Sequence, residues 1–113
     1  MPPPAYTIDG RELVAQAPGL RVQVLTLGRG QCVPWHHHTV ITDTFFCLTG
    51  PMLVETRDPD ARTHLECGGR LSVPPGRPHF VRGVDDGPCS FAIVQGVGAY
   101  DYIPEEAPPA KPG

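Results

Sequence analysis

Glycine and proline interrupt this chain so often that no segment of it can form a long helix. The sequence contains 13 glycines and 15 prolines in 113 residues, and the runs between them are rich in Val, Leu, Phe and Thr. Such runs favour strands, whereas a proline inside a helix removes a hydrogen bond and clashes with the preceding turn. Short strand-like runs at this spacing predict an all-β protein of about eight to ten strands, arranged as a double-sheet jelly roll.

The length allows one domain, because a second hydrophobic core would not fit. We expect three parts. Residues 1–19 form an N-terminal extension, proline-rich at 1–5 and with a short hairpin at 6–16 turning at Asp9-Gly10. Residues 20–103 form the barrel, and residues 104–113 form a flexible tail. The expected strands are 20–27, 45–48, 52–57, 63–67, 70–73, 79–82 and 90–95, with 99–103 pairing at an edge or covering the barrel.

Charge and hydropathy argue against several classes of partner. The net charge is −3 and the basic residues are scattered, so no surface for nucleic acid or an anionic membrane is indicated. No apolar run approaches the roughly 20 residues of a membrane helix, and the Met-Pro-Pro-Pro start lacks the basic character of a signal peptide. The expected location is the cytoplasm, and the expected partner is a small-molecule substrate.

The four cysteines, at positions 32, 47, 67 and 89, form no C-x-x-C pair. Without a secretory context, buried and reduced thiols are the better interpretation than a disulfide framework. A redox role is disfavoured, because free cysteine usually packs as a small apolar residue.

Two histidines two residues apart, His36 and His38, lie among strand-forming residues. Residues at this spacing point to the same face of a strand, so both rings can reach one ion while His37 turns away. His79 follows a Pro-Pro-Gly-Arg-Pro turn that can aim the next side chain inward. Three histidines and the nearby Asp43 make a ligand set for one divalent transition metal per chain, of the group Fe, Mn, Ni, Cu and Zn. The alternative is a set of ordinary surface or core histidines; His37 and His64 fit that description better.

The spacing around these residues resembles the two motifs of the cupin family. The first motif reads glycine, five residues, His-x-His, three or four residues, glutamate, six residues and glycine. Here it reads Gly30, His36, His38, Asp43 and Gly50. The second reads glycine, five residues, Pro-x-Gly, two residues, histidine, three residues and asparagine. Here it reads Gly68, Pro74, Gly76, His79 and then Gly83 in place of the asparagine. The resemblance implies a double-stranded β-helix, the cupin barrel, with a metal held by the histidines and the acid.

Asp43 stands where the family has a glutamate, and its side chain is shorter by one methylene. Four interpretations stay open. Asp43 binds the metal directly after a backbone shift, binds through water, leaves a three-histidine site, or ends a hydrogen-bond network beside Thr42 and Thr44. Three-histidine sites occur in cupin-like thiol and diketone dioxygenases, which is an analogy of fold and ligand set.

Counting by two along the strands from the ligands predicts a mostly apolar substrate pocket lined by Phe45, Cys47 and Val81. Cys47 could instead be core packing or a reactive thiolate near the metal. Tyr100 and Tyr102 would cap this pocket and donate to a substrate, or simply pack at an edge. No catalytic residue is assigned.

Two functional hypotheses follow. The preferred one is a small metalloenzyme with dioxygenase-like chemistry; a redox-neutral isomerase, lyase or hydratase is the alternative within the enzymes. The other class is a non-catalytic cupin that binds a small metabolite. A homodimer is expected, because the outward residues Phe46 and Leu48 need a cover.

Overall fold

The computed structural model describes residues 6–107, which form ten strands and a short 3₁₀ turn at Val84–Asp86. The residues that the sequence assigns to the proline-rich start (1–5) and to most of the tail (108–113) lie outside this range. The strands are β1 (Gly10–Ala17), β2 (Leu20–Leu27), β3 (Cys32–His37), β4 (Thr42–Thr49), β5 (Met52–Thr56), β6 (Ala61–Leu65), β7 (Arg70–Val73), β8 (His79–Gly83), β9 (Cys89–Gly96) and β10 (Ile103–Pro104).

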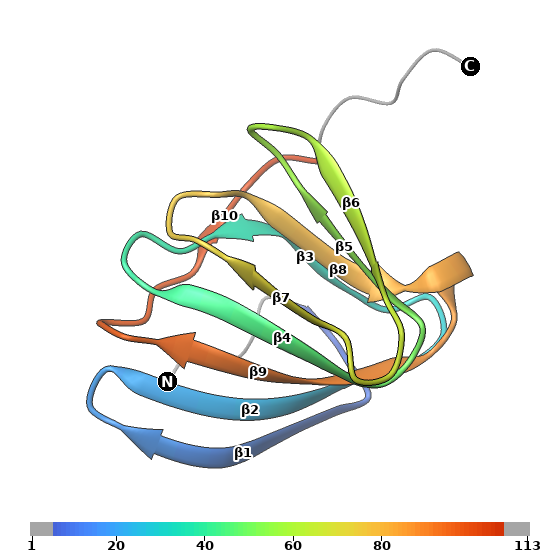
Figure 1. Ribbon diagram of the computed structural model, residues 1–113, viewed down its shortest axis with the longest axis horizontal. Helices are drawn as coiled ribbons and strands as arrows, with labels where there is room; N and C mark the ends of the chain where they lie inside the picture. Colours follow the sequence, from blue (N-terminus) through green and yellow to red (C-terminus); the bar gives the residue numbers. More distant parts are fainter. Residues whose placement is uncertain (1–5, 108–113) are drawn as a thin grey trace.

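The strands form two five-stranded antiparallel sheets that face each other (Figure 1). The first sheet has the order β1-β2-β9-β4-β7, and the second has the order β10-β3-β8-β5-β6. Strands that follow one another in the chain often belong to opposite sheets, as β3 and β4 do. The fold is therefore the double-stranded β-helix that the turn residues and the two motifs predict.

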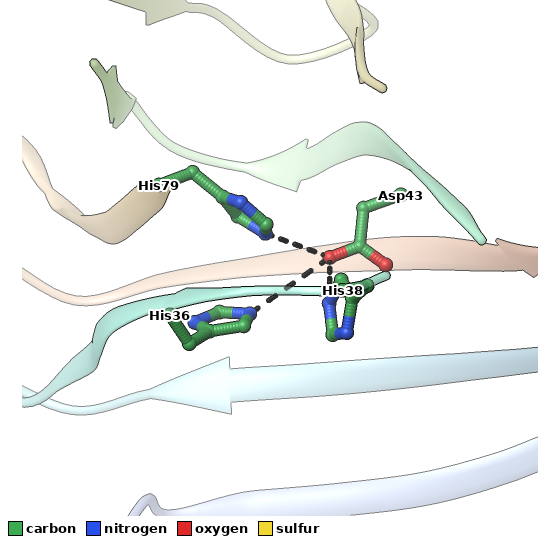
Figure 2. A group of neighbouring side chains, drawn as sticks. All are labelled: His36, His38, Asp43 and His79. Atoms are coloured by element: carbon green, nitrogen blue, oxygen red, sulfur yellow. Dashed lines mark hydrogen bonds and ion pairs between the residues drawn. The ribbon is translucent and has the colours of Figure 1, made fainter. Parts of the chain in front are cut away.

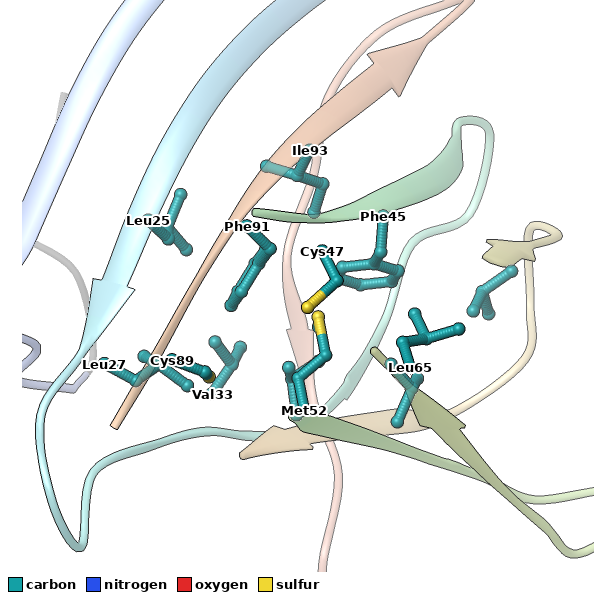
Figure 3. Packing of buried hydrophobic residues seen from close by; sticks show 13 residues of the cluster. Leu25, Leu27, Val33, Phe45, Cys47, Met52, Leu65, Cys89, Phe91 and Ile93 are labelled. Atoms are coloured by element: carbon teal, nitrogen blue, oxygen red, sulfur yellow. The ribbon is translucent and has the colours of Figure 1, made fainter. Parts of the chain in front are cut away.

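The apolar core lies between the two sheets. Alternate residues of β9 point inward, so Cys89, Phe91, Ile93 and Gln95 are buried while the residues between them are only partly buried. The apolar side chains among them meet those of the opposite sheet in one cluster (Figure 3). The cluster contains Leu25, Leu27, Val33, Phe45, Cys47, Met52, Val54, Leu65, Val73, Val81, Cys89, Phe91 and Ile93.

The N-terminal hairpin differs from the sequence expectation. Residues 10–17 form one strand, β1, which pairs along the whole of β2, and the chain reverses at Pro18-Gly19 instead of Asp9-Gly10. Gly19 has φ of 76°, which glycine adopts without a steric penalty, and this places the turn there. Asp9 lies just before β1, and its backbone N–H donates to Gln31 Oε1.

The structure also corrects the bounds of one predicted strand and the burial of two cysteines. The strand predicted at 63–67 is β6, Ala61–Leu65, because it pairs residue for residue with the five residues of β5. Residues 66–69 form the following turn, in which the Gly69 N–H donates to the Glu66 carbonyl. Cys67 lies in this turn and is exposed, and Cys32 is only partly buried, so the expectation of four buried thiols holds for Cys47 and Cys89 alone.

The segment of residues 97–107, here called the C-terminal strap, crosses from the first sheet to the second (Figure 1). Only Ile103–Pro104 is strand, and it pairs with His36 and His37 of β3. The backbone N–H of Glu105 donates to the carbonyl of Trp35, which ties the start of the predicted tail to the barrel.

Trp35 itself lies on the outer face of β3. Its ring stacks on Phe80 with 5.8 Å between the ring centroids, and the guanidinium of Arg57 lies 4.5 Å from the indole centroid. Within residues 6–107, no helix has the length and apolar character that crossing a bilayer requires.

Candidate metal centre

Four buried side chains from both sheets meet at one point inside the barrel (Figure 2). His36 and His79 come from neighbouring strands β3 and β8 and are register partners, His38 directly follows β3, and Asp43 belongs to β4 of the opposite sheet. One ligand-type atom from each residue lies within 4.8 Å of the others. Each of the four residues is at most 3% exposed. The structure therefore brings together all four residues that the sequence selects as metal ligands.

Local backbone irregularities aim these side chains inward. The pairing of β3 with β8 shifts between Val33 and His36, so that His36, three residues after Val33, also faces the interior. Pro34 lies in this irregular stretch and has no N–H to offer a regular ladder. The turn before His79 contains Gly76, with φ of 79°, whose N–H donates to the His38 carbonyl over 2.7 Å. This bond joins the two motifs directly.

The Nδ1 atom of each histidine is bonded to a backbone carbonyl. His36 Nδ1 is 2.8 Å from the Pro34 oxygen, His79 Nδ1 is 2.9 Å from the Arg77 oxygen, and His38 Nδ1 is 2.6 Å from the Asp101 oxygen. A carbonyl only accepts, so each Nδ1 carries the proton and donates it. These bonds fix the ring orientations and turn the three Nε2 atoms toward the centre of the cluster.

Oδ2 of Asp43 is the oxygen at that centre. It lies 2.7 Å from His38 Nε2, 2.8 Å from His79 Nε2 and 4.0 Å from His36 Nε2. The other carboxylate oxygen, Oδ1, accepts from Gln95 Nε2 over 3.2 Å. The shorter acid thus reaches the histidines from β4.

The hydrogen-bond arrangement tests whether a metal fits here. His38 and His79 each face an acceptor at both ring nitrogens, yet a neutral imidazole has one N–H. Proton-only bonding would thus put two imidazolium rings on one buried carboxylate oxygen. A cation between the Nε2 atoms and Oδ2 uses the same lone pairs without those protons, and imidazole plus carboxylate suits a divalent transition metal. The four residues could therefore hold such an ion.

Burial and neighbouring charges shift the pKa values of His36 and His38 in opposite directions. Burial, with the neighbouring His79 charge as the next cause, lowers the pKa of His36 to about 3, so His36 is neutral at pH 7. Burial also opposes a charge on His38, but the hydrogen bond and the charge of Asp43 outweigh it and raise the His38 pKa. For Asp43, burial is outweighed by the hydrogen bonds from His38 and His79, which lower its pKa far below the usual range. The carboxylate is thus ionised and available as a ligand.

A small pocket with a cavity volume of about 20 Å³ adjoins the cluster, about the room that one water molecule needs. His36, Asp43 and Phe45 line it, as the sequence predicts for Phe45. Cys47 and Val81 do not line it and belong to the apolar core instead. They point inward as expected, but neighbouring side chains fill the barrel around them.

Two buried glutamines line the same pocket and were not singled out from the sequence. Gln95 donates to Asp43, and its own carbonyl accepts from Gln23 Nε2 over 2.9 Å and from Arg21 Nε over 2.9 Å. The sequence does contain a signal that could have identified these two glutamines. Gln23 and Gln95 share the inward parity of the apolar residues in β2 and β9, and a polar residue at such a position needs a buried partner.

The C-terminal strap covers the cluster with two aromatic rings. Tyr102 stacks on His36 at 4.5 Å between ring centroids, and Tyr100 lies 5.3 Å from His38. The expectation that residues 99–103 cover the barrel is therefore confirmed for these two rings. His37 points outward to Glu105, and His64 bonds to Glu66, so neither belongs to the cluster.

Comparisons with known proteins agree on the fold. No protein-family model matches the sequence, and no curated protein matches it closely enough to count as a relative. Many solved structures share the fold. An uncharacterised conserved protein with a double-stranded β-helix domain from Klebsiella pneumoniae is 23% identical with a TM-score of 0.74, over 92% of this chain and 90% of that one.

Two further matches are described as cupins. An RmlC-like cupin protein from Desulfovibrio desulfuricans is 25% identical with a TM-score of 0.65, over 77% of this chain and 80% of that one. A cupin-2 domain containing protein from Shewanella frigidimarina is 17% identical with a TM-score of 0.66, over 80% of this chain and 82% of that one. With both spaced motifs meeting inside the same double-stranded β-helix, the protein is a cupin by fold.

Proposed function

We propose that the protein is a metal-dependent enzyme that acts on a small organic molecule at the His36, His38, Asp43 and His79 cluster. The observation that carries this proposal is the convergence of the histidine Nε2 atoms on Asp43 Oδ2, with every Nδ1 proton already bonded to a backbone carbonyl. Such an arrangement orients lone pairs toward a cation before the cation arrives.

The pocket supports a catalytic use of this cluster. His36 and Asp43 belong to the cluster and also line the pocket, so a molecule that enters the pocket contacts these ligand residues directly. A divalent transition metal, when bound, supplies Lewis acidity or, if it is redox-active, electron transfer. The chain itself orients the ligands, excludes water with Tyr100 and Tyr102, and surrounds the reacting molecule with Phe45 and the two glutamines.

Dioxygenase-like chemistry remains our first choice within the enzymes, and redox-neutral isomerisation, elimination or hydration the second. The sequence favoured the dioxygenase through a weak or absent carboxylate ligand. The position of Asp43 removes part of that support, since its Oδ2 lies within 2.8 Å of two histidines. The identity of the metal decides between the two, because only a redox-active metal supports reaction with dioxygen.

The test starts from protein purified without chelator. We expect about one divalent transition metal per chain by elemental mass spectrometry, and oxygen uptake with a panel of thiols, β-diketones and hydroxylated aromatics. His36→Ala and His79→Ala should lose the metal, while His64→Ala, an exposed histidine outside the cluster, should keep it. Full metal content in both cluster variants would refute the ligand assignment. A metal-loaded protein that turns over no compound of the panel would favour the binding cupin instead.

We also propose that the protein forms a homodimer. Support comes from β1, which is the edge strand of the first sheet and leaves Leu13 and Val14 about half exposed. Exposed apolar side chains on an unpaired edge favour association. Sedimentation equilibrium checks the mass, and Leu13→Glu should shift a dimer toward monomer.

A further inference from the structure

We propose that Arg11 and Tyr6 form an anion-binding end of the pocket, and that the ligand taken there is a small organic acid bound through its carboxylate. The inference deepens the proposed function, which places the metal at the other end of the same pocket. Arg11, Tyr6 and Tyr102 line this pocket together with His36 and Asp43. A molecule within it can therefore contact the guanidinium and the ligand cluster at once.

Arg11 is held in place without its charge being neutralised. Its Nη2 donates to the Tyr6 hydroxyl over 3.0 Å, and its Nη1 donates to Gln23 Oε1 over 3.3 Å. Both acceptors are neutral. Within residues 6–107, no carboxylate lies within ion-pair distance of Arg11, whereas Arg57, Arg62 and Arg82 each have at least one. The hydrogen bonds to Tyr6 and Gln23 use two of the five N–H groups of the guanidinium, whose fork matches a carboxylate.

The charges around the pocket favour an anion at this end. Asp43 is the only carboxylate among the described residues that line the pocket, and the histidines and Gln95 already surround it. Arg11 brings a positive charge to this end of the pocket, which attracts a negatively charged ligand.

The buried glutamines link Arg11 to Asp43 by a chain of hydrogen bonds, in which each residue donates to the next one toward Asp43. Gln23 Oε1 accepts from Arg11, Gln23 Nε2 donates to Gln95 Oε1, and Gln95 Nε2 donates to Asp43 Oδ1. Because cations donate to the outer amide oxygens, the amide NH₂ groups point toward Asp43. The chain of bonds positions the exposed Arg11 on a buried partner, Gln23, and so holds its guanidinium at the pocket.

The wall between the two ends selects the body of the ligand. Tyr6 and Tyr102 have ring centroids 6.2 Å apart, and Tyr102 stacks on His36. Phe45 lies across the cavity. Aromatic faces favour a flat or apolar body. The cavity has room for about one water molecule, so an acid fits only if the strap moves aside and enlarges it.

The test measures binding of acetate and benzoate, each beside its neutral amide, by calorimetry on the Zn²⁺-loaded protein at fixed ionic strength. We expect each acid to bind about tenfold more tightly than its amide, because a hydrogen bond to a charged group exceeds one to a neutral group. Arg11→Gln should lose about this factor for the acids and leave the amides unchanged. Arg29→Gln, which removes one positive charge from an exposed loop position, is the matched control and should bind like the wild type.

Three results would overturn the inference: equal affinity for acid and amide, equal acid affinity in Arg11→Gln and Arg29→Gln, or no binding of either acid to the wild type. Arg11→Lys keeps the charge without the fork and should bind the acids with intermediate affinity. A Zn²⁺ titration comes first. If neither Zn²⁺ nor another divalent transition metal binds, the proposed function fails, while the same comparison on the metal-free protein still tests Arg11.

Discussion

Gln95 donates to Oδ1 of Asp43 over 3.2 Å, which leaves Oδ2 as the oxygen that faces His38 and His79. The two residues are register partners on the neighbouring strands β9 and β4. Because of this bond, Oδ1 of the carboxylate is held by Gln95 and Oδ2 is directed at the histidines. Gln95 is therefore a positioning residue for Asp43.

Gln95→Leu should weaken metal binding. The substitution keeps the volume but removes the donor, so the carboxylate can turn away from the histidines. Loss of such an outer hydrogen bond typically costs about 10–100-fold in metal affinity. Competition titration of Zn²⁺ against a chelating dye measures this loss. Gln16→Leu, an exposed glutamine of β1, is the control, and equal affinities in the two variants would contradict the assigned role.

Asp43→Asn tests the acid itself. The amide is nearly isosteric but carries no negative charge, so a direct ligand role predicts a clear drop in bound metal at neutral pH. Elemental mass spectrometry after dialysis gives the stoichiometry. Unchanged metal content would instead indicate that the three histidines suffice.

Leu27→Ala should destabilise the barrel by about 2–5 kcal/mol, because Leu27 is fully buried and its removal leaves a cavity in the core. Val40→Ala truncates a side chain that is 51% exposed in the loop between β3 and β4, and it should change stability by about 0.5 kcal/mol or less. Urea unfolding of both variants compares them. Similar losses would place Leu27 outside the core.

Exposure and thiol pKa together should set the order in which the cysteines react. Cys67 is exposed, whereas Cys47 and Cys89 are buried. Burial also raises the pKa of Cys47, and it raises the pKa of Cys89 to about 11, so little thiolate forms at either residue at neutral pH. Iodoacetamide followed by peptide mass spectrometry should find Cys67 modified first and Cys89 last. Modification of Cys89 in the folded protein before Cys67 would contradict this order.

Alkaline pH should destabilise the fold through Cys89. Its pKa rises from 9.0, the ordinary value, to about 11 in the folded protein, because burial favours the neutral thiol. The unfolded chain therefore releases its proton more readily. This contribution to stability is complete below pH 9 and is lost as the pH rises from 9 through 11. Thermal unfolding across this range measures the loss, and Cys89→Ala should show a shallower fall.

The spacing of the motifs predicted the ligand cluster because each part of it follows from local rules. Two histidines two apart share a strand face, and the Pro-Gly turn before His79 aims that side chain. The strand at Arg70–Val73 was predicted to the residue, since glycine and proline bound it on both sides.

The parts that could not be predicted depend on contacts between distant segments. Asp9-Gly10 has a good turn sequence, but the pairing of β1 along all of β2 outweighs it. Counting by two along the strands correctly placed Cys47 and Val81 on the inner face. It could not show whether other side chains fill the interior around them or leave an open pocket. The bond from His38 to the Asp101 carbonyl joins residues 63 positions apart, and no local pattern indicates it.

The outward position of Trp35 has a practical consequence for anyone who follows ligand binding optically. The chain has one tryptophan, and its indole stacks on Phe80 and lies next to the Arg57 guanidinium on the outside of the barrel. Indole emission will report on that outer surface, whereas all three tyrosines, Tyr6, Tyr100 and Tyr102, line the cavity. Absorbance or emission of the tyrosines is therefore the more informative signal for an occupant of the interior.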